Sequence, residues 1–183
     1  MSTIVIKRSD VKTKVVALCV AVVASVILPQ IFHVAGQVSG MGASLGASML
    51  PMHIPVFTAG LLFGPVVGFF AGLISPIISF AISGMPVESL LPYIAVELCV
   101  YGLICGTLHK TKMPVFIKLI VAQIAGRAVR ALMVVASVYL FESGLALTSI
   151  ISMITTAIPG ILLQWALIPL LVHRIEGYLK TDE

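Results

Sequence analysis

Residues 15–87 read VVALCVAVVASVILPQIFHVAGQVSGMGASLGASMLPMHIPVFTAGLLFGPVVGFFAGLISPIISFAISGMPV and contain no Asp, Glu, Lys or Arg. A helix that crosses a membrane needs about 20 mostly apolar residues, so this stretch holds up to three of them. The whole chain agrees, because 60% of its 183 residues are hydrophobic and only 10% are charged. A soluble domain averages about 25% charged residues, and disorder needs still more polar sequence. The composition therefore predicts a protein whose solvent is lipid.

On both sides of this stretch and within it, apolar runs alternate with short polar turns. They predict six transmembrane helices, at 15–33, 50–64, 65–83, 90–108, 114–140 and 145–172, with a break at Pro159-Gly160 in the sixth. The N-terminus is polar and basic, and the residues after 172 form a polar tail. The fold class expected is an all-α membrane protein, a six-helix bundle in which residues 1–183 form one integral membrane domain.

The basic residues predict the orientation of this bundle. Nine Lys and Arg residues fall on the side that holds both termini, and the opposite loops at 36–49, 84–89 and 141–144 hold none. These nine are Lys7, Arg8, Lys12, Lys14, Lys110, Lys112, Lys118, Arg174 and Lys180. Because cytoplasmic loops are enriched in Lys and Arg, both termini are expected in the cytoplasm. The basic residues form no continuous stripe, so no nucleic-acid partner is expected.

The sequence lacks the common motifs of nucleotide-binding proteins and of several enzyme classes. The phosphate-binding pattern GxxxxGK[ST] is absent, as are HExxH, GxSxG and GxGxxG. Cys19, Cys99 and Cys105 lie in apolar runs without a CxxC pair, which favours small buried side chains over a disulfide or metal site. No catalytic residue, metal or cofactor is predicted, and the chain is not expected to be an enzyme. If ATP drives its function, another chain must bind the nucleotide.

Three charged residues inside predicted helices are the most informative, because intramembrane charges usually serve function. They are Glu97, Arg127 and Arg130. The two arginines share a helix face with Gln123, and Glu97 is expected at a similar depth. One arginine should pair with Glu97, while the other should bind an acidic group of a substrate. Arg130 is favoured for the substrate because it lies nearer the outer surface, although a purely structural Glu–Arg bridge is equally compatible with the pattern.

Other polar residues complete the candidate site. His53 lies at the outer end of the second predicted helix, and Gln164 follows the break in the sixth. Gln37 and Met41 belong to a glycine-rich outer loop that resembles a lid over a polar pocket. Each has a structural alternative, namely a histidine bonded to backbone, a glutamine within the bundle, or a plain connecting loop.

Small residues recur at every fourth position on four predicted helices. Ala17, Ala21 and Ser25 form a stripe on the first, and glycines follow the same spacing at 60, 64, 68 and 72 and at 102 and 106. Such spacing lets helices approach closely, either within the bundle or against a partner protein. The smooth stripe on the first helix favours docking.

Two features together carry a resemblance to a known family. They are the segment MHIPVFTAGLLFGPVVGFFAGLISPIISFAISGMP, residues 52–86, and the Ala17-xxx-Ala21-xxx-Ser25 stripe. With them the chain resembles the substrate-binding S component of energy-coupling factor (ECF) vitamin transporters, in the branch around pantothenate, riboflavin and folate. The resemblance implies a six-helix bundle in the prokaryotic plasma membrane, with a substrate site near the outer surface under the first loop. It also implies a transmembrane coupling subunit and two ATPase subunits as partners, with the AxxxA-like stripe as the docking contact.

A small anionic, vitamin-like substrate is therefore expected, and pantothenate fits two arginines, a glutamine and a histidine. Folate usually requires more aromatic stacking than a chain with 7% aromatic residues provides. The alternatives left open are an S component for folate, riboflavin or another vitamin precursor, and a self-sufficient secondary transporter. The latter would need inverted repeats, of which the two halves show no convincing sign.

Overall fold

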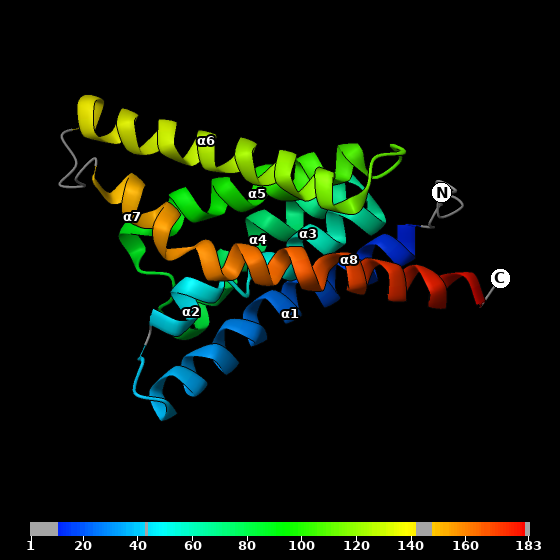
Figure 1. The fold of residues 1–183 in the computed structure, drawn as a ribbon, viewed down its shortest axis with the longest axis horizontal. Coiled ribbons are helices and arrows are strands. Elements are labelled where there is room, and N and C mark those ends of the chain that lie inside the picture. Colours follow the sequence, from blue (N-terminus) through cyan, green and yellow to red (C-terminus); the bar gives the residue numbers. More distant parts are fainter. Residues whose placement is uncertain (1–10, 43, 142–147, 182–183) are drawn as a thin grey trace.

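The computed structural model describes residues 11–42, 44–141 and 148–181, and the regular elements in these ranges are all helical (Figure 1). In chain order they are α1 (Val11–Val38), α2 (Ser44–Met49), α3 (His53–Phe63), α4 (Pro65–Ser83), the 3₁₀ turn η1 (Glu88–Leu90), α5 (Leu91–Leu108), α6 (Val115–Phe141), α7 (Thr148–Thr156) and α8 (Ile158–Thr181). The start of α1 and the end of α8 lie at the same end of the bundle (Figure 1). The prediction of an all-α protein is confirmed for the described residues.

Five described helices are long and apolar enough to cross a membrane, namely α1, α4, α5, α6 and α8. The predicted span at 50–64 is instead α3, which has 11 residues and a length of about 16 Å, well short of a hydrocarbon core of about 30 Å. Nearly all of α3 is buried, because α1, α4, α5 and α8 surround it. A helix enclosed by protein need not match the bilayer thickness, so the prediction of six full-length spans is not confirmed.

The boundaries of other elements also differ from those predicted. The first helix continues to Val38, and the expected loop at 36–49 contains the short helix α2. The sixth span is broken as predicted, but the break falls at Ala157, and Pro159 is the second residue of α8. Proline is tolerated there because the first helical turn has no partner for its backbone N–H. Helix α8 also continues through the predicted polar tail, whereas the predicted turn at 141–144 and the start of the last span fall largely outside the described residues.

The glycine repeats pack helices against each other inside the bundle. A Cβ atom added to Gly68 would lie 2.2 Å from the carbonyl oxygen of Gly102, and one added to Gly102 would lie 2.0 Å from that of Gly68. Gly60 and Gly106 approach neighbouring backbone almost as closely. These glycines therefore let α3, α4 and α5 lie in backbone contact, which is the internal packing that the spacing allowed.

The stripe on α1 also faces the bundle. Ala21 is 6% exposed and Ser25 is fully buried, whereas Ala17 is half-buried. The exposed face of α1 carries Val16, Val20, Val23 and Ile27 instead. Docking of a partner through the stripe stays a prediction, and in this chain two of its three members already pack against other helices.

The cysteines are free, as expected, but they are not all buried. Cys99 and Cys105 are buried in α5, whereas Cys19 is exposed. The prediction for Cys19 was wrong because this residue lies on the face of α1 opposite Ala21, beside the exposed Val20 and Val23.

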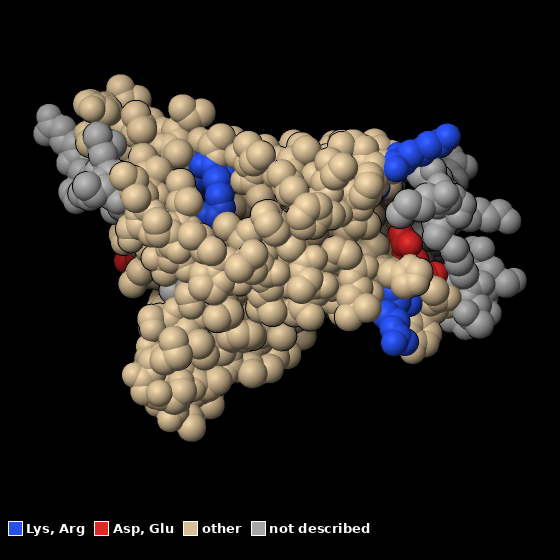
Figure 2. All heavy atoms as spheres, in the orientation of Figure 1, with Lys and Arg blue, Asp and Glu red and all other residues tan. Residues whose placement is uncertain are grey.

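Charges gather at the end of the bundle where α1 begins and α8 ends (Figure 2). Near this end the Lys118 ammonium donates to the carbonyl oxygen of His109 at 3.1 Å, and the His109 Nδ1 lies 2.5 Å from the carbonyl oxygen of Gly106. Burial holds the pKa of the His109 imidazole below its usual value. One further basic group is visible between α6 and α7, where uncharged atoms surround it (Figure 2).

Candidate functional site

A cavity of about 340 Å³ lies at the end of the bundle away from the start of α1. Residues from the second half of α1, from α2, from the start of α3 and α5, and from α4, α6 and α7 contribute to its wall. Its polar side chains are His33, His53, Ser79, Glu97, Arg127, Arg130, Ser152 and Thr156. The volume is that of a small-molecule site, and most of the remaining wall is apolar.

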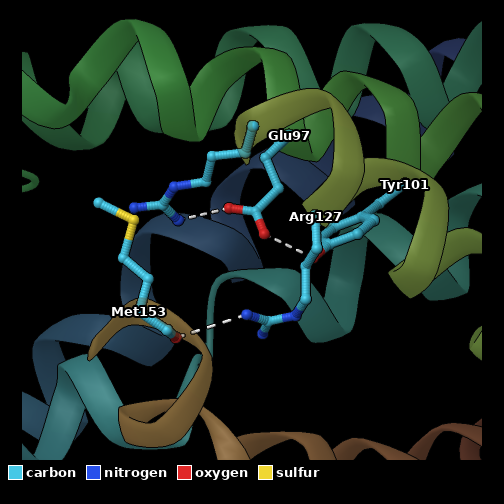
Figure 3. A network of polar contacts seen from close by, with 5 residues as sticks. Glu97, Tyr101, Arg127 and Met153 are labelled. Carbon is cyan, nitrogen blue, oxygen red and sulfur yellow. Dashed lines mark hydrogen bonds and ion pairs between the residues drawn. The ribbon is translucent and has the colours of Figure 1, made fainter. Parts of the chain in front are cut away.

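Glu97 is the centre of a charged cluster at this wall (Figure 3). Its Oε2 atom lies 2.5 Å from Nη1 of Arg130, and its Oε1 atom accepts a hydrogen bond of 2.5 Å from the Tyr101 hydroxyl. The carboxylate is 1% exposed and the Arg130 side chain 14% exposed. The predicted pairing of Glu97 with one arginine is confirmed, and it joins α5 to α6.

The structure assigns this pairing to Arg130, which the sequence favoured as the substrate contact. Arg130 pairs with Glu97 because it lies opposite this residue on the neighbouring helix. It also lines the cavity, so a contact between Arg130 and the substrate stays a prediction. Arg127 is left over. Its Nη1 atom lies 3.4 Å from the carbonyl oxygen of Met153, longer than an ordinary hydrogen bond (Figure 3).

Arg127 therefore carries a charge that no described carboxylate balances. Its Nε atom is buried without a hydrogen-bond partner among the described residues, as is the Nε atom of Arg130. Two guanidinium groups and one carboxylate line the cavity, which leaves one positive charge in excess. A buried or membrane-embedded cation is costly without a counter-ion, so the cavity suits an anion.

His53 lies at the first position of α3 and lines the same cavity. It is 5% exposed, and its ring centroid lies 5.5 Å from that of Tyr101. Neither ring nitrogen makes a well-formed hydrogen bond to a described residue. An imidazole can both donate and accept, so His53 can serve a polar molecule in the cavity.

Gln123 and Gln164 do not line the cavity but tie the bundle together. Gln123 donates to the side-chain oxygen of Gln164 at 2.8 Å and accepts from the Trp165 indole at 2.8 Å. The Gln164 amide in turn lies 3.4 Å from the carbonyl oxygen of Leu50. Gln123 lies one helical turn before Arg127 on α6. At that level of the bundle its side chain contacts α8 and does not reach the cavity.

Gln37 and Met41 also lie away from the cavity wall. Because α1 continues beyond the predicted end, Gln37 is exposed in its last turn and Met41 is 53% exposed in the segment that follows. The wall is formed by His33 of α1 and Gly46 of α2 instead. A Cβ atom on Gly46 would lie 2.9 Å from the His33 ring, so α2 packs tightly over this histidine.

Sequence reasoning missed His33, Ser79, Tyr101 and Ser152. Tyr101 could have been found, because it follows Glu97 by one helical turn and can reach its carboxylate. Gly126 on α6 makes room for it, since a Cβ atom there would lie 2.3 Å from the tyrosine ring. The two serines and His33 follow no pattern that distinguishes them from other polar residues in the helices.

The described residues include no group of three or more His, Cys, Asp or Glu side chains that could hold a metal ion. Comparisons with curated proteins and with solved structures found no match. The family model described as the substrate-specific component of ECF transporters matches residues 12–172, nearly the whole chain. Together with the five apolar helices, this match identifies a multi-pass membrane protein. The chain therefore belongs to the family of substrate-specific components of ECF transporters.

Proposed function

We propose that the cavity binds a small anionic, vitamin-type substrate from the outer side of the membrane. Arg127 carries this proposal, because it lines the cavity without a described carboxylate to balance its charge. An oxyanion placed there would receive charge-assisted hydrogen bonds from the guanidinium. His53 and the hydroxyl groups of Ser152 and Thr156 would serve the polar groups of the same molecule.

Pantothenate is the first substrate to test, as a carboxylate with hydroxyl and amide groups. Aromatic side chains contribute nothing to the described cavity wall apart from the two histidines, which argues against the stacking that folate or riboflavin would need. Because Glu97 pairs with Arg130, the Arg127 guanidinium is left to bind the one carboxylate of pantothenate.

The decisive experiment compares pantothenate with pantothenol, in which a primary alcohol replaces the carboxylate. Equilibrium dialysis of the purified full-length chain should show binding of pantothenate and at least tenfold weaker binding of the neutral alcohol, since a hydrogen bond between charged groups is about twice as strong as a neutral one. Equal affinity for the two compounds would contradict an anion site. Failure of the chain to bind pantothenate and other small carboxylates would contradict the substrate class.

Family membership supports delivery of the substrate through an ECF module, formed by a transmembrane coupling subunit and two ATPases. We propose that α1 contacts this module. The contact would use Ala17 and the exposed face that carries Val16 and Val20, since Ala21 and Ser25 are buried within the chain. Uptake in vesicles should require all partners, whereas uptake by the chain alone would identify a secondary transporter.

The proposed orientation has both termini in the cytoplasm and the segment after α1 outside. In cells that express a Ser39→Cys variant on a background without Cys19, a membrane-impermeant maleimide should label residue 39 without permeabilisation. Lys112→Cys, in the turn between α5 and α6, is the matched control and should react only after permeabilisation. Labelling of residue 112 in intact cells, and of residue 39 only after permeabilisation, would show the opposite orientation.

A further inference from the structure

A groove of about 300 Å³ runs between α6 and α8, separate from the cavity described above. Its sides are apolar and include Ile124 of α6 and Ile161 and Leu162 of α8. Arg127 and Ile158 lie at one end, while Gln123 and Trp165, which are hydrogen-bonded to each other, lie toward the other. The helices α6 and α8 contact each other, with α6 along the upper edge and α8 across the middle of the view in Figure 1.

The groove opens toward the outside of the bundle. Ile124 is 65% exposed, Leu162 is 57% exposed and Ile158 is 49% exposed, so its rim faces the lipid when α6 and α8 cross a membrane. Figure 2 shows a basic group at the surface between α6 and α7, surrounded by uncharged atoms. An apolar channel beside a cation suits a molecule that has an acidic head and an apolar remainder.

Arg127 lies between the groove and the cavity, because it lines both. A molecule whose carboxylate lies on Arg127 therefore has two spaces available, a polar one toward the outer end of the bundle and an apolar one along α8. Arg127 also lines a smaller recess, together with Glu97 of α5 and Met153 of α7.

The depth of Arg127 decides where such an anion comes from. The residue follows the first residue of α6 by twelve positions, which places it about 18 Å along a helix of 27 residues. It is thus near the middle of the span, and a lipid phosphate at the membrane surface cannot reach it. An acid that enters through the outer cavity can, so the head group belongs to the substrate.

We infer that the substrate is an amphipathic acid, whose carboxylate binds Arg127 and whose apolar portion lies in the groove between α6 and α8. This inference rests on the proposed function and narrows it. Within the class of small acids, the groove favours those with an aliphatic extension. Pantothenate and pantothenol therefore test the anion site, whereas aliphatic acids test the groove.

The test measures the affinity of the purified full-length chain for linear acids of increasing length, with propanoate, butanoate, pentanoate and hexanoate as probes. Each methylene group moved from water into the groove should tighten binding about fourfold, equivalent to about 0.8 kcal/mol. Hexanoate should therefore bind about 60-fold more tightly than propanoate. Calorimetry in one detergent at one pH gives this ratio directly.

Two matched variants locate the apolar portion. Ile161→Phe fills the groove with a larger side chain and should reduce the ratio of hexanoate to propanoate affinity to below about fivefold. Leu170→Phe makes a similar change on α8, at an exposed position that does not line the groove, and should keep the native ratio. Because both variants share the detergent, partition of the acids into micelles cancels from the comparison.

The outcomes separate this inference from the proposed function. If propanoate binds but length adds nothing, the groove does not take the substrate, so the inference fails and the anion site stands. If Ile161→Phe keeps the native ratio, the apolar portion lies elsewhere and the inference fails as well. If none of the acids binds while the chain remains folded by thermal unfolding, the anion site itself is wrong and both proposals fall.

Discussion

Replacement of Arg130 by glutamine is expected to destabilise the bundle strongly, by about 3–5 kcal/mol, the usual cost of removing one partner from a buried ion pair. The reason is the carboxylate that remains. Glu97 is 1% exposed and would keep only the hydrogen bond from the Tyr101 hydroxyl. The measurement is the thermal unfolding of the purified protein, together with the yield of folded protein after extraction from membranes.

Two further variants distinguish the loss of the ion pair from the loss of any arginine. Arg127→Gln removes the same side chain one turn earlier on α6, where the hydrogen bond to Met153 is long, and should unfold close to the native temperature. A double variant, Glu97→Gln with Arg130→Gln, replaces the charges by two neutral amides and should recover part of the stability. Equal destabilisation by Arg127→Gln and Arg130→Gln would contradict the assignment of the pair.

Much of the fold could be predicted because each helix that crosses the lipid must be apolar and long enough to span it. Each of the long helices α1, α4, α5, α6 and α8 overlaps one of the predicted spans, although α1 and α8 extend beyond theirs. The failure at α3 has a physical cause, since a short apolar run that is enclosed by other helices has the same composition as one that crosses lipid. Pro159 was taken as a break, although at the second position of a helix it is a starting residue.

The candidate site could be predicted in its charges but less well in its hydrogen bonds. Glu97 and the arginines stand out because charges are rare inside a membrane, and their meeting followed from depth alone. Which arginine pairs with Glu97 depends on the rotation of α6 against α5, which depth does not determine. Gln123 and Gln164 have chemistry equally suited to a ligand and to one another, and only the contact between α6 and α8 shows that they bond together.

Arg127→Gln should have the opposite phenotype to Arg130→Gln, with folding retained and binding lost. Removing the guanidinium should weaken the affinity for a carboxylate substrate by about 2–5 kcal/mol, as expected when one member of a desolvated charge pair is truncated. The affinity for a neutral analogue, such as pantothenol in place of pantothenate, should change far less. Calorimetry on the native chain and the variant with both compounds gives the four affinities required.

The variant Arg127→Lys tests whether the geometry of the guanidinium matters, because it keeps the charge and removes the planar fork of donors. If the carboxylate binds through two parallel hydrogen bonds, lysine should restore only part of the lost affinity. Full recovery with lysine would mean that Arg127 acts as a point charge and does not fix the orientation of the substrate. Unchanged affinity for the carboxylate in Arg127→Gln would contradict the anion site, because the excess charge of Arg127 is the observation on which that site rests.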